Sequence, residues 1–250
     1  MLIDTHAHPH MEDCGIPPEQ FATHARKASV AQIVCVGTDA DDSQRALEFA
    51  HMYEYVASVG LHPHEASQFQ EDFSHIASLA SHQLVVAIGE CGLDYHYENS
   101  PRQEQLEALH AQINLSKRVE LPLIFHVRGG FGDFLDVFDQ HQSITGVVHS
   151  FTGDVATMRA CLQRGLYIGL NGIMTFSKDP EHYQVLREVP LESLVLETDA
   201  PFLTPHPYRG KINHSAHVRT VAEFLSEKRG ESVQDIARKT TDNARRLFRL

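Results

Sequence analysis

Six side chains of the types that bind divalent metals are spread along the sequence, each near the carboxyl end of a short apolar run. Four are histidines and two are carboxylates: His6, His8, Glu90, His126, His149 and Asp199. Residues two apart in an extended segment project to the same side, so His6 and His8 can bind one ion together. One tetrahedral ion needs only three or four protein ligands, and this set contains no thiolate. It therefore predicts two divalent ions, of Zn, Mn, Mg or Co.

The position of these residues matters more than their type. A single histidine is more often a hydrogen-bonded core or surface residue than a metal ligand. Glu90 stands at the end of the fourth apolar run, and a carboxylate there can bridge two ions about 3.5 to 4 Å apart. Ions at that spacing clamp the attacking and leaving oxygens of an in-line displacement. The chemistry indicated is phosphoester hydrolysis.

Eight short runs rich in Val, Ile and Leu alternate with longer helical patterns, which is typical of parallel strands joined by crossover helices. The predicted strands are residues 2–5, 32–36, 55–59, 84–88, 122–125, 145–148, 166–170 and 193–196. In a closed barrel the carboxyl ends of all strands meet at one mouth, where distant ligands converge. We therefore predict an α/β protein with a single (β/α)8 TIM-type barrel. An open doubly wound sheet is less favoured, because histidines rather than a glycine-rich loop follow the first strand.

The helical segments carry their own signals. Ser100 and Gln103 predict a capping box, with Pro101 at the first position of the helix. Apolar residues at helical spacing predict two further helices, near residues 218–225 and 233–248. The second of these is an extra C-terminal helix beyond the eight strand–helix units.

Length and charge narrow the class of protein. The 250 residues match the typical size of one (β/α)8 domain, so we expect residues 1–250 to form a single domain. The formal net charge of −12 argues against a broad basic surface for gripping duplex nucleic acid. The sequence shows no secretory leader and no apolar run long enough to span a bilayer. We expect a cytoplasmic protein with no membrane partner and no obligate protein partner.

From end to end, the sequence resembles the TatD family of metal-dependent deoxyribonucleases, among the amidohydrolase-type barrel hydrolases. The resemblance rests on ordered motifs: IDTHAH, GLHPH, IGECGLDY, PLIFHVR, GVVHSFTG, LETDAPFLTPHPYRGK and TTDNARRLF. It implies a metal-dependent hydrolase of ester bonds that cleaves DNA exonucleolytically, in single strands or at ends. Three departures from the family pattern bear on specificity: Pro9-His10, Gly130 and Asn213-His214-Ser215.

The resemblance also implies roles for the six metal-type residues. One ion would be held by His6, His8, Glu90 and Asp199, and the other by Glu90, His126 and His149. Glu90 would bridge the two ions. Glu90 and Asp199 would be the catalytic carboxylates: a metal-bound hydroxide attacks phosphorus, and Asp199 orients it or takes its proton.

Other residues are predicted substrate contacts, and each has a structural alternative. By the resemblance, His62 and His64 face the scissile phosphate, whereas the alternative is a polar turn. Arg128 contacts phosphate or instead pairs with Asp133 or Asp94.

A second group of predicted contacts follows the eighth strand. Tyr208, Arg209 and Lys211 form a DNA-contacting loop through stacking and phosphate pairing, or are an ordinary polar loop. Glu197 supports a metal ligand or is simply a buried carboxylate.

Two alternatives to a nuclease also stay open, because the fold and the metal do not determine which bond is cleaved. They are a barrel hydrolase of a small ester, cyclic amide or aminoacyl ester, and a metal-binding scaffold without turnover.

Overall fold

The computed structural model describes residues 1–250 except for the side chain of Asp13. Its strands are β1 (Leu2–Ala7), β2 (Val30–Val36), β3 (Val56–Val59), β4 (Val85–Asp94), β5 (Leu123–Arg128), β6 (Gly146–Val148), β7 (Tyr167–Leu170) and β8 (Leu194–Leu196). They are neighbours in chain order in one eight-stranded sheet. All eight predicted strands are therefore confirmed.

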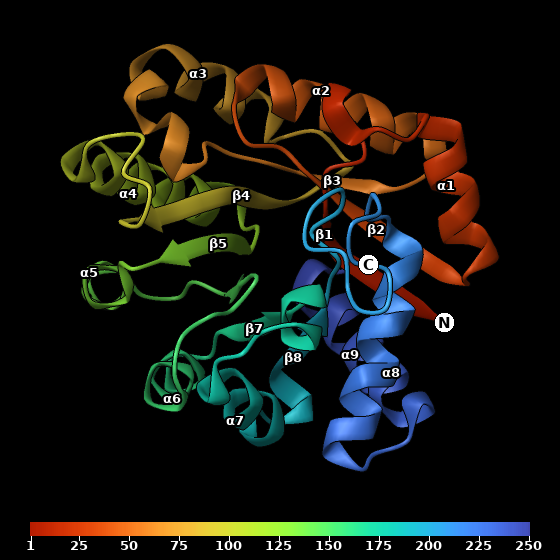
Figure 1. The fold of residues 1–250 in the computed structure, drawn as a ribbon. Coiled ribbons are helices and arrows are strands. Elements are labelled where there is room, and N and C mark those ends of the chain that lie inside the picture. Colours follow the sequence, from red (N-terminus) through yellow and green to blue (C-terminus); the bar gives the residue numbers. More distant parts are fainter. The chain divides into compact units, whose positions relative to one another are not determined.

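Each strand is followed by at least one α-helix before the next strand or the end of the chain (Figure 1). The helices are α1 (Pro18–Lys27), α2 (Ala40–Tyr53), α3 (Phe69–Leu79), α4 (Arg102–Val119), α5 (Phe131–Asp139), α6 (Val155–Gln163), α7 (Pro180–Glu188), α8 (Val218–Arg229) and α9 (Val233–Phe248). Short 3-10 helices are η1 (Glu12–Cys14), η2 (Pro63–Gln68), η3 (Gly172–Thr175), η4 (Leu191–Ser193) and η5 (Ser215–His217). Helix α9 is the predicted extra C-terminal helix. Within the described chain, no helix combines the length and apolarity needed to cross a membrane.

Strands β4 and β5 run further than the apolar pattern predicts. β4 continues to Asp94 and β5 to Arg128, so Glu90 and His126 lie inside strands rather than after them. Residues 87–94 are all buried, including both carboxylates of this segment. Because the buried positions of this strand include charged residues, the apolar pattern stops before the strand does.

Tertiary contacts divide the chain into two compact units. The first comprises Met1–Val34 and Ser150–Leu250, and the second Cys35–His149. In the second unit β4 and β5 pair in parallel, with Gly92 opposite His126. Helix α4 packs along β4 (Figure 1). On its inner face it buries Leu109 and Ile113. The expectation of a single domain stays a prediction.

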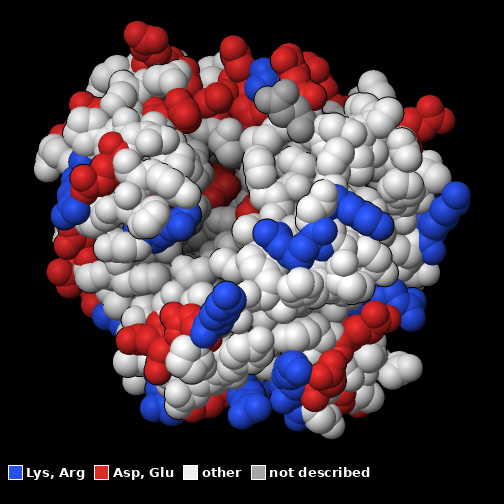
Figure 2. Space-filling view, viewed as in Figure 1, with Lys and Arg blue, Asp and Glu red and all other residues white. Residues whose placement is uncertain are grey.

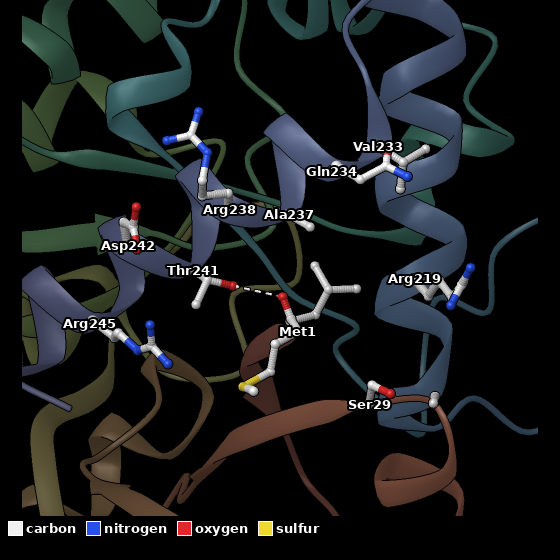
Figure 3. Close-up of a pocket in the computed structure, with 12 residues that line it drawn as sticks. Met1, Ser29, Arg219, Val233, Gln234, Ala237, Arg238, Thr241, Asp242 and Arg245 are labelled. Atoms are coloured by element: carbon white, nitrogen blue, oxygen red, sulfur yellow. Dashed lines mark hydrogen bonds between the residues drawn. The ribbon is translucent and has the colours of Figure 1, made fainter.

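In the first unit β7 and β8 pair in parallel, and Ala7 at the end of β1 forms a bridge with Ala200. Helix α9 packs against β1 and β8. Where α9 meets the start of β1, Thr241 Oγ1 donates to the Met1 carbonyl at 3.2 Å (Figure 3). A cavity of about 450 Å³ opens there, and none of the predicted metal ligands is among the described residues that line it.

The predicted capping box at the start of α4 is wrong. Pro101 is the N-cap residue and has no side-chain cap, while the amide of Gln103 bonds Glu107. The Ser100 hydroxyl donates instead to the carbonyl of His64 at 2.7 Å. It also accepts from the Ser67 N–H at 3.1 Å. Ser100 therefore secures the loop after β3, a long-range contact that outweighs the local capping signal.

Candidate metal centre

Three donor atoms converge at the carboxyl side of β4, β5 and β6 in the second unit. Glu90 Oε1 lies 2.7 Å from His149 Nε2 and 2.9 Å from His126 Nδ1. The two histidine nitrogens are 3.3 Å apart. Ligands about 2.0 to 2.1 Å from one tetrahedral ion lie about 3.3 Å from each other. The separation of the two histidine nitrogens matches that spacing, whereas the two distances to Glu90 Oε1 are shorter. All three predicted ligands are brought together.

Asp94 orients the ring of His126. Asp94 Oδ2 lies 3.1 Å from His126 Nε2 and 2.9 Å from His64 Nε2. A carboxylate on one ring nitrogen fixes the tautomer and leaves the other nitrogen, here Nδ1, as the ligand. Burial alone would raise the pKa of Asp94, but hydrogen bonds from His126, the Tyr97 N–H and His64 hold it below its ordinary value. Asp94 therefore stays ionised.

Gly92 allows the close approach of β4 to β5 on which the His126 position depends. Its φ is +149°, and a Cβ built there would lie 1.9 Å from the carbonyl oxygen of His126. Only glycine readily adopts that conformation, and backbone has to move to accept any side chain.

We expect Gly92→Ala to weaken metal binding and activity by at least about tenfold, because it displaces a ligand-bearing strand. Metal content per chain and ester hydrolysis are the measurements. Gly132→Ala in α5 is the matched control, because a Cβ there meets no atom within 4 Å. A Gly92→Ala protein with normal metal content would contradict this account of the site.

A second set of three donors lies in the first unit. His6 Nε2 and His8 Nε2 are 3.1 Å apart, and each is 3.5 Å from Asp199 Oδ1. These separations also fit a tetrahedral ion, for which about 3.3 Å is expected. The Asp199 N–H donates to the His6 carbonyl at 2.9 Å, which ties the residue to β1. Asp199 has a φ of 56°, a left-handed conformation that Asp and Asn tolerate better than other side chains.

Asp4 and Asn213 hold this set in place, and the sequence interpretation assigned neither of them that role. Asp4 is fully buried and accepts from the Thr198 N–H at 2.8 Å and the Thr198 hydroxyl at 2.6 Å. Burial raises the pKa of Asp4 to about 7, against hydrogen bonds that lower it. The amide of Asn213 donates to the carbonyls of Thr198 and Phe202, at 2.9 and 2.5 Å. The segment that carries Asp199 is thus fixed on both sides.

His62 faces the same carboxylate oxygen as the ligands of the second unit. Its Nε2 is 3.5 Å from Glu90 Oε1, and its Nδ1 accepts from the His64 N–H at 3.1 Å. Burial lowers the pKa of His62 to about 4, so the ring is neutral. With Nδ1 accepting, the hydrogen-bond network assigns the proton to Nε2. His62 is therefore a donor aimed at the site, a geometry suited to a phosphate oxygen.

The other predicted contacts of the second unit are His64 and Arg128. His64 is occupied by Asp94, so it supports the site rather than facing it. The guanidinium of Arg128 lies 4.7 Å from the centre of the Tyr97 ring. The two predicted structural partners of Arg128 have other contacts. Asp133 accepts from the Tyr95 hydroxyl, and Asp94 is bonded to His64 and His126.

The predicted DNA-contacting loop belongs to the first unit and is exposed. Tyr208 stacks on His217 with ring centres 4.7 Å apart, and Lys211 lies 5.9 Å from the Tyr208 ring. Arg209 donates to the Thr204 carbonyl at 3.0 Å and lies over the Phe176 ring. Glu197 accepts from the Ser150 N–H at 2.6 Å, which supports the segment after His149.

On the face drawn in Figure 2, Lys and Arg lie in separate small groups among acidic and uncharged residues.

Neutral histidines support this loop. His217 stacks on His214 at 4.0 Å, and His214 lies 4.7 Å from His24. Burial lowers the pKa of both His214 and His217 from 6.5 to about 4. Protons therefore bind the unfolded chain first, so the stability that the stack contributes is present above pH 6.5 and is lost as the pH falls towards 4.

We expect the urea midpoint to be lower at pH 5 than at pH 7.5, and the difference to shrink in His214→Gln. His51→Gln, an exposed histidine of α2, is the control and should behave like the wild type. An unchanged pH difference in His214→Gln would show that the stack does not contribute.

Comparison with known proteins places these observations in a family context. A family model described as TatD related DNase matches residues 3–249. The uncharacterized metal-dependent hydrolase YabD of Bacillus subtilis is 39% identical, over 100% of both chains. The 3′-5′ ssDNA/RNA exonuclease TatD of Salmonella typhimurium is 36% identical, over 92% of each chain. The crystal structure of YJJV, a TatD homologue from Escherichia coli, superposes with a TM-score of 0.93 at 29% identity and covers 100% of this chain and 98% of its own. The predicted (β/α)8 TIM-type fold is confirmed.

Proposed function

Because the chain belongs to the family of TatD related DNases and is a metal-dependent hydrolase of ester bonds, we propose that it removes nucleotides from the ends of single-stranded DNA. Relatives named as 3′-5′ ssDNA/RNA exonucleases, 36% and 35% identical, support this substrate class. The formal net charge of −12 supports a compact site over a long basic track along duplex DNA.

One observation carries the proposal: in each unit three donor atoms lie within 3.5 Å of one another. We propose two divalent ions, of Zn, Mn, Mg or Co. The first would be held by His6, His8 and Asp199, and the second by His126 and His149, with Glu90 shared. In a (β/α)8 fold the carboxyl ends of the strands form one active-site face, which is the reason to assign both ions to one reaction.

Bound divalent ions would supply Lewis acidity, lower the pKa of the attacking water and offset charge on phosphate. The protein's own groups then have distinct tasks. The Asp199 carboxylate orients the water and accepts its proton as phosphorus is attacked. The Nε2–H of His62 donates to a nonbridging phosphate oxygen, where negative charge grows in the transition state. Asp94 and Asp4 hold the ligand-bearing segments in position.

The test is a comparison of substrates with metal-reconstituted protein. Single-stranded DNA labelled at either end, duplex DNA, a small carboxylic ester, a cyclic amide and an aminoacyl ester are assayed with Mn, Mg, Co and Zn. We expect mononucleotide release from single strands, with metal content near two ions per chain. Intact DNA together with turnover of an ester or amide would overturn the proposal in favour of a small-molecule hydrolase.

The salt dependence of DNA binding gives an independent prediction. If ions and a few side chains contact phosphate, log Kd should rise with log salt at a slope of about 2, since each contact to a single strand adds about 0.7. Binding is measured by fluorescence anisotropy between 50 and about 300 mM salt, a range in which that slope is resolved. A slope of about 6 or more, equivalent to some eight released counterions, would indicate an extended basic track instead.

A further inference from the structure

Tyr97 is an exposed aromatic residue three positions after Asp94, the carboxylate that orients the candidate ligand His126. Its side chain is 56% exposed although the strand before it is buried. Its backbone is fixed, because Asp94 Oδ1 accepts from the N–H groups of His96 and Tyr97, at 2.9 and 3.0 Å. The carboxyl group that orients the ligand His126 therefore also positions Tyr97. The Tyr97 ring meets the His96 ring edge to face at 4.7 Å, but more than half of the residue stays exposed, so surface remains for another flat group.

Arg128, on the neighbouring strand, contacts the ring of Tyr97. It is the last residue of β5, two positions after His126, and its guanidinium carbon lies 4.7 Å from the centre of the Tyr97 ring. The Tyr97 ring also meets His64 edge to face at 5.7 Å, and His64 is bonded to Asp94. Tyr97 and Arg128 thus form one surface, which the Asp94 carboxylate connects to the candidate ligand His126.

A second arginine–tyrosine pair in the same unit differs from Tyr97 and Arg128 because its arginine is paired with a carboxylate. Arg102 lies 4.2 Å from the Tyr95 ring, but its charge is paired with Glu98, and the Tyr95 hydroxyl donates to Asp133. Arg128 forms no ion pair with any carboxylate in the described part of the chain. An exposed guanidinium without an acidic partner is suited to a phosphate.

We propose that Tyr97 and Arg128 form the subsite for the nucleotide next to the cleaved bond, with its base stacked on Tyr97 and its phosphate held by Arg128. The proposal rests on the proposed nuclease function. Stacking on an aromatic ring is tolerant of base identity, since every base has a flat π face. The subsite therefore selects single-stranded nucleic acid over phosphodiesters that lack a base, and it does not select a sequence.

The experiment separates the base from the phosphate. Two oligodeoxynucleotides of the same length are compared, one with normal bases and one with abasic tetrahydrofuran residues at its last three positions. Binding is measured by anisotropy and cleavage by kcat/KM, for the wild type and for Tyr97→Ala, Tyr97→Trp, Arg128→Ala and the control Arg102→Ala. Metal content and thermal unfolding verify that each protein is intact.

We expect Tyr97→Ala to weaken binding and cleavage of the normal strand by at least about fivefold. It should leave the abasic strand unchanged, and Tyr97→Trp should restore the preference for bases. Arg128→Ala should weaken both strands and lower the salt slope by about 0.7, whereas Arg102→Ala should match the wild type. Equal loss on both strands in Tyr97→Ala, or an unchanged preference, would overturn the subsite. Wild-type protein that binds the normal strand with this preference but cleaves neither strand would instead overturn the nuclease function alone.

Discussion

Glu90→Gln is expected to lower kcat/KM on single-stranded DNA by on the order of a thousandfold or more, with the fold intact. Glu90 Oε1 is the atom on which His126, His149 and His62 all converge, at 2.7 to 3.5 Å. The amide has nearly the same shape but no charge, and it is a much poorer ligand for a divalent ion. Loss of the negative charge at Glu90 should therefore weaken metal binding by the candidate ligands.

Metal analysis and circular dichroism accompany the kinetic measurement of this variant. The metal content should fall below that of the wild type while the spectrum stays the same. Glu107→Gln is the control, since Glu107 is an exposed carboxylate on α4 that bonds Gln103. Undiminished turnover in Glu90→Gln would refute the assignment of Glu90 as a ligand.

The strands and the convergence of the candidate ligands were predictable because both follow local rules. Apolar runs separated by helical patterns define parallel strands, and the chemistry of such a fold lies at the strand ends. His6, His8 and Asp199 are brought together as predicted in one unit, and Glu90, His126 and His149 in the other. Residue type and position were sufficient because the carboxyl ends of neighbouring parallel strands lie close together.

The supporting residues were not predictable in the same way. Asp4 acts on Thr198, and Asp94 acts on His64 and His126, across 194, 30 and 32 positions. No spacing rule in the sequence connects such pairs, and a buried aspartate reads equally well as a turn or cap residue. The capping box predicted at Ser100 is wrong for the same reason, because the Ser100 hydroxyl donates to the distant His64 carbonyl and does not cap the helix that it precedes.

The signal that could have identified Asp4 and Asp94 is their position in apolar surroundings. Asp4 lies within β1 and Asp94 ends β4, where a charged side chain is costly unless it is paired. Both are completely buried and each accepts at least three hydrogen bonds. A carboxylate inside a predicted buried strand therefore predicts a partner, although it does not say which one.

Asp199→Asn tests the step that the ligand spacing alone does not address, the removal of a proton from the attacking water. Asn tolerates the left-handed conformation at this position, where φ is 56°, so the backbone of the segment is preserved. Asp199→Ala would confound the result, because Ala adopts that conformation with strain. The Asp4 and Asn213 hydrogen bonds to Thr198 do not involve the Asp199 side chain and should persist.

The amide cannot accept a proton at neutral pH, so kcat should fall by about a hundredfold to ten-thousandfold. KM for single-stranded DNA should change much less, because the other proposed contacts to substrate do not involve Asp199. The assay is run with metal in excess, so that weaker binding at His6 and His8 does not limit the rate, and Asp242→Asn on α9 is the control. An Asp199→Asn protein that raises KM and keeps kcat would make Asp199 a residue of substrate binding, and the proton would then need another acceptor.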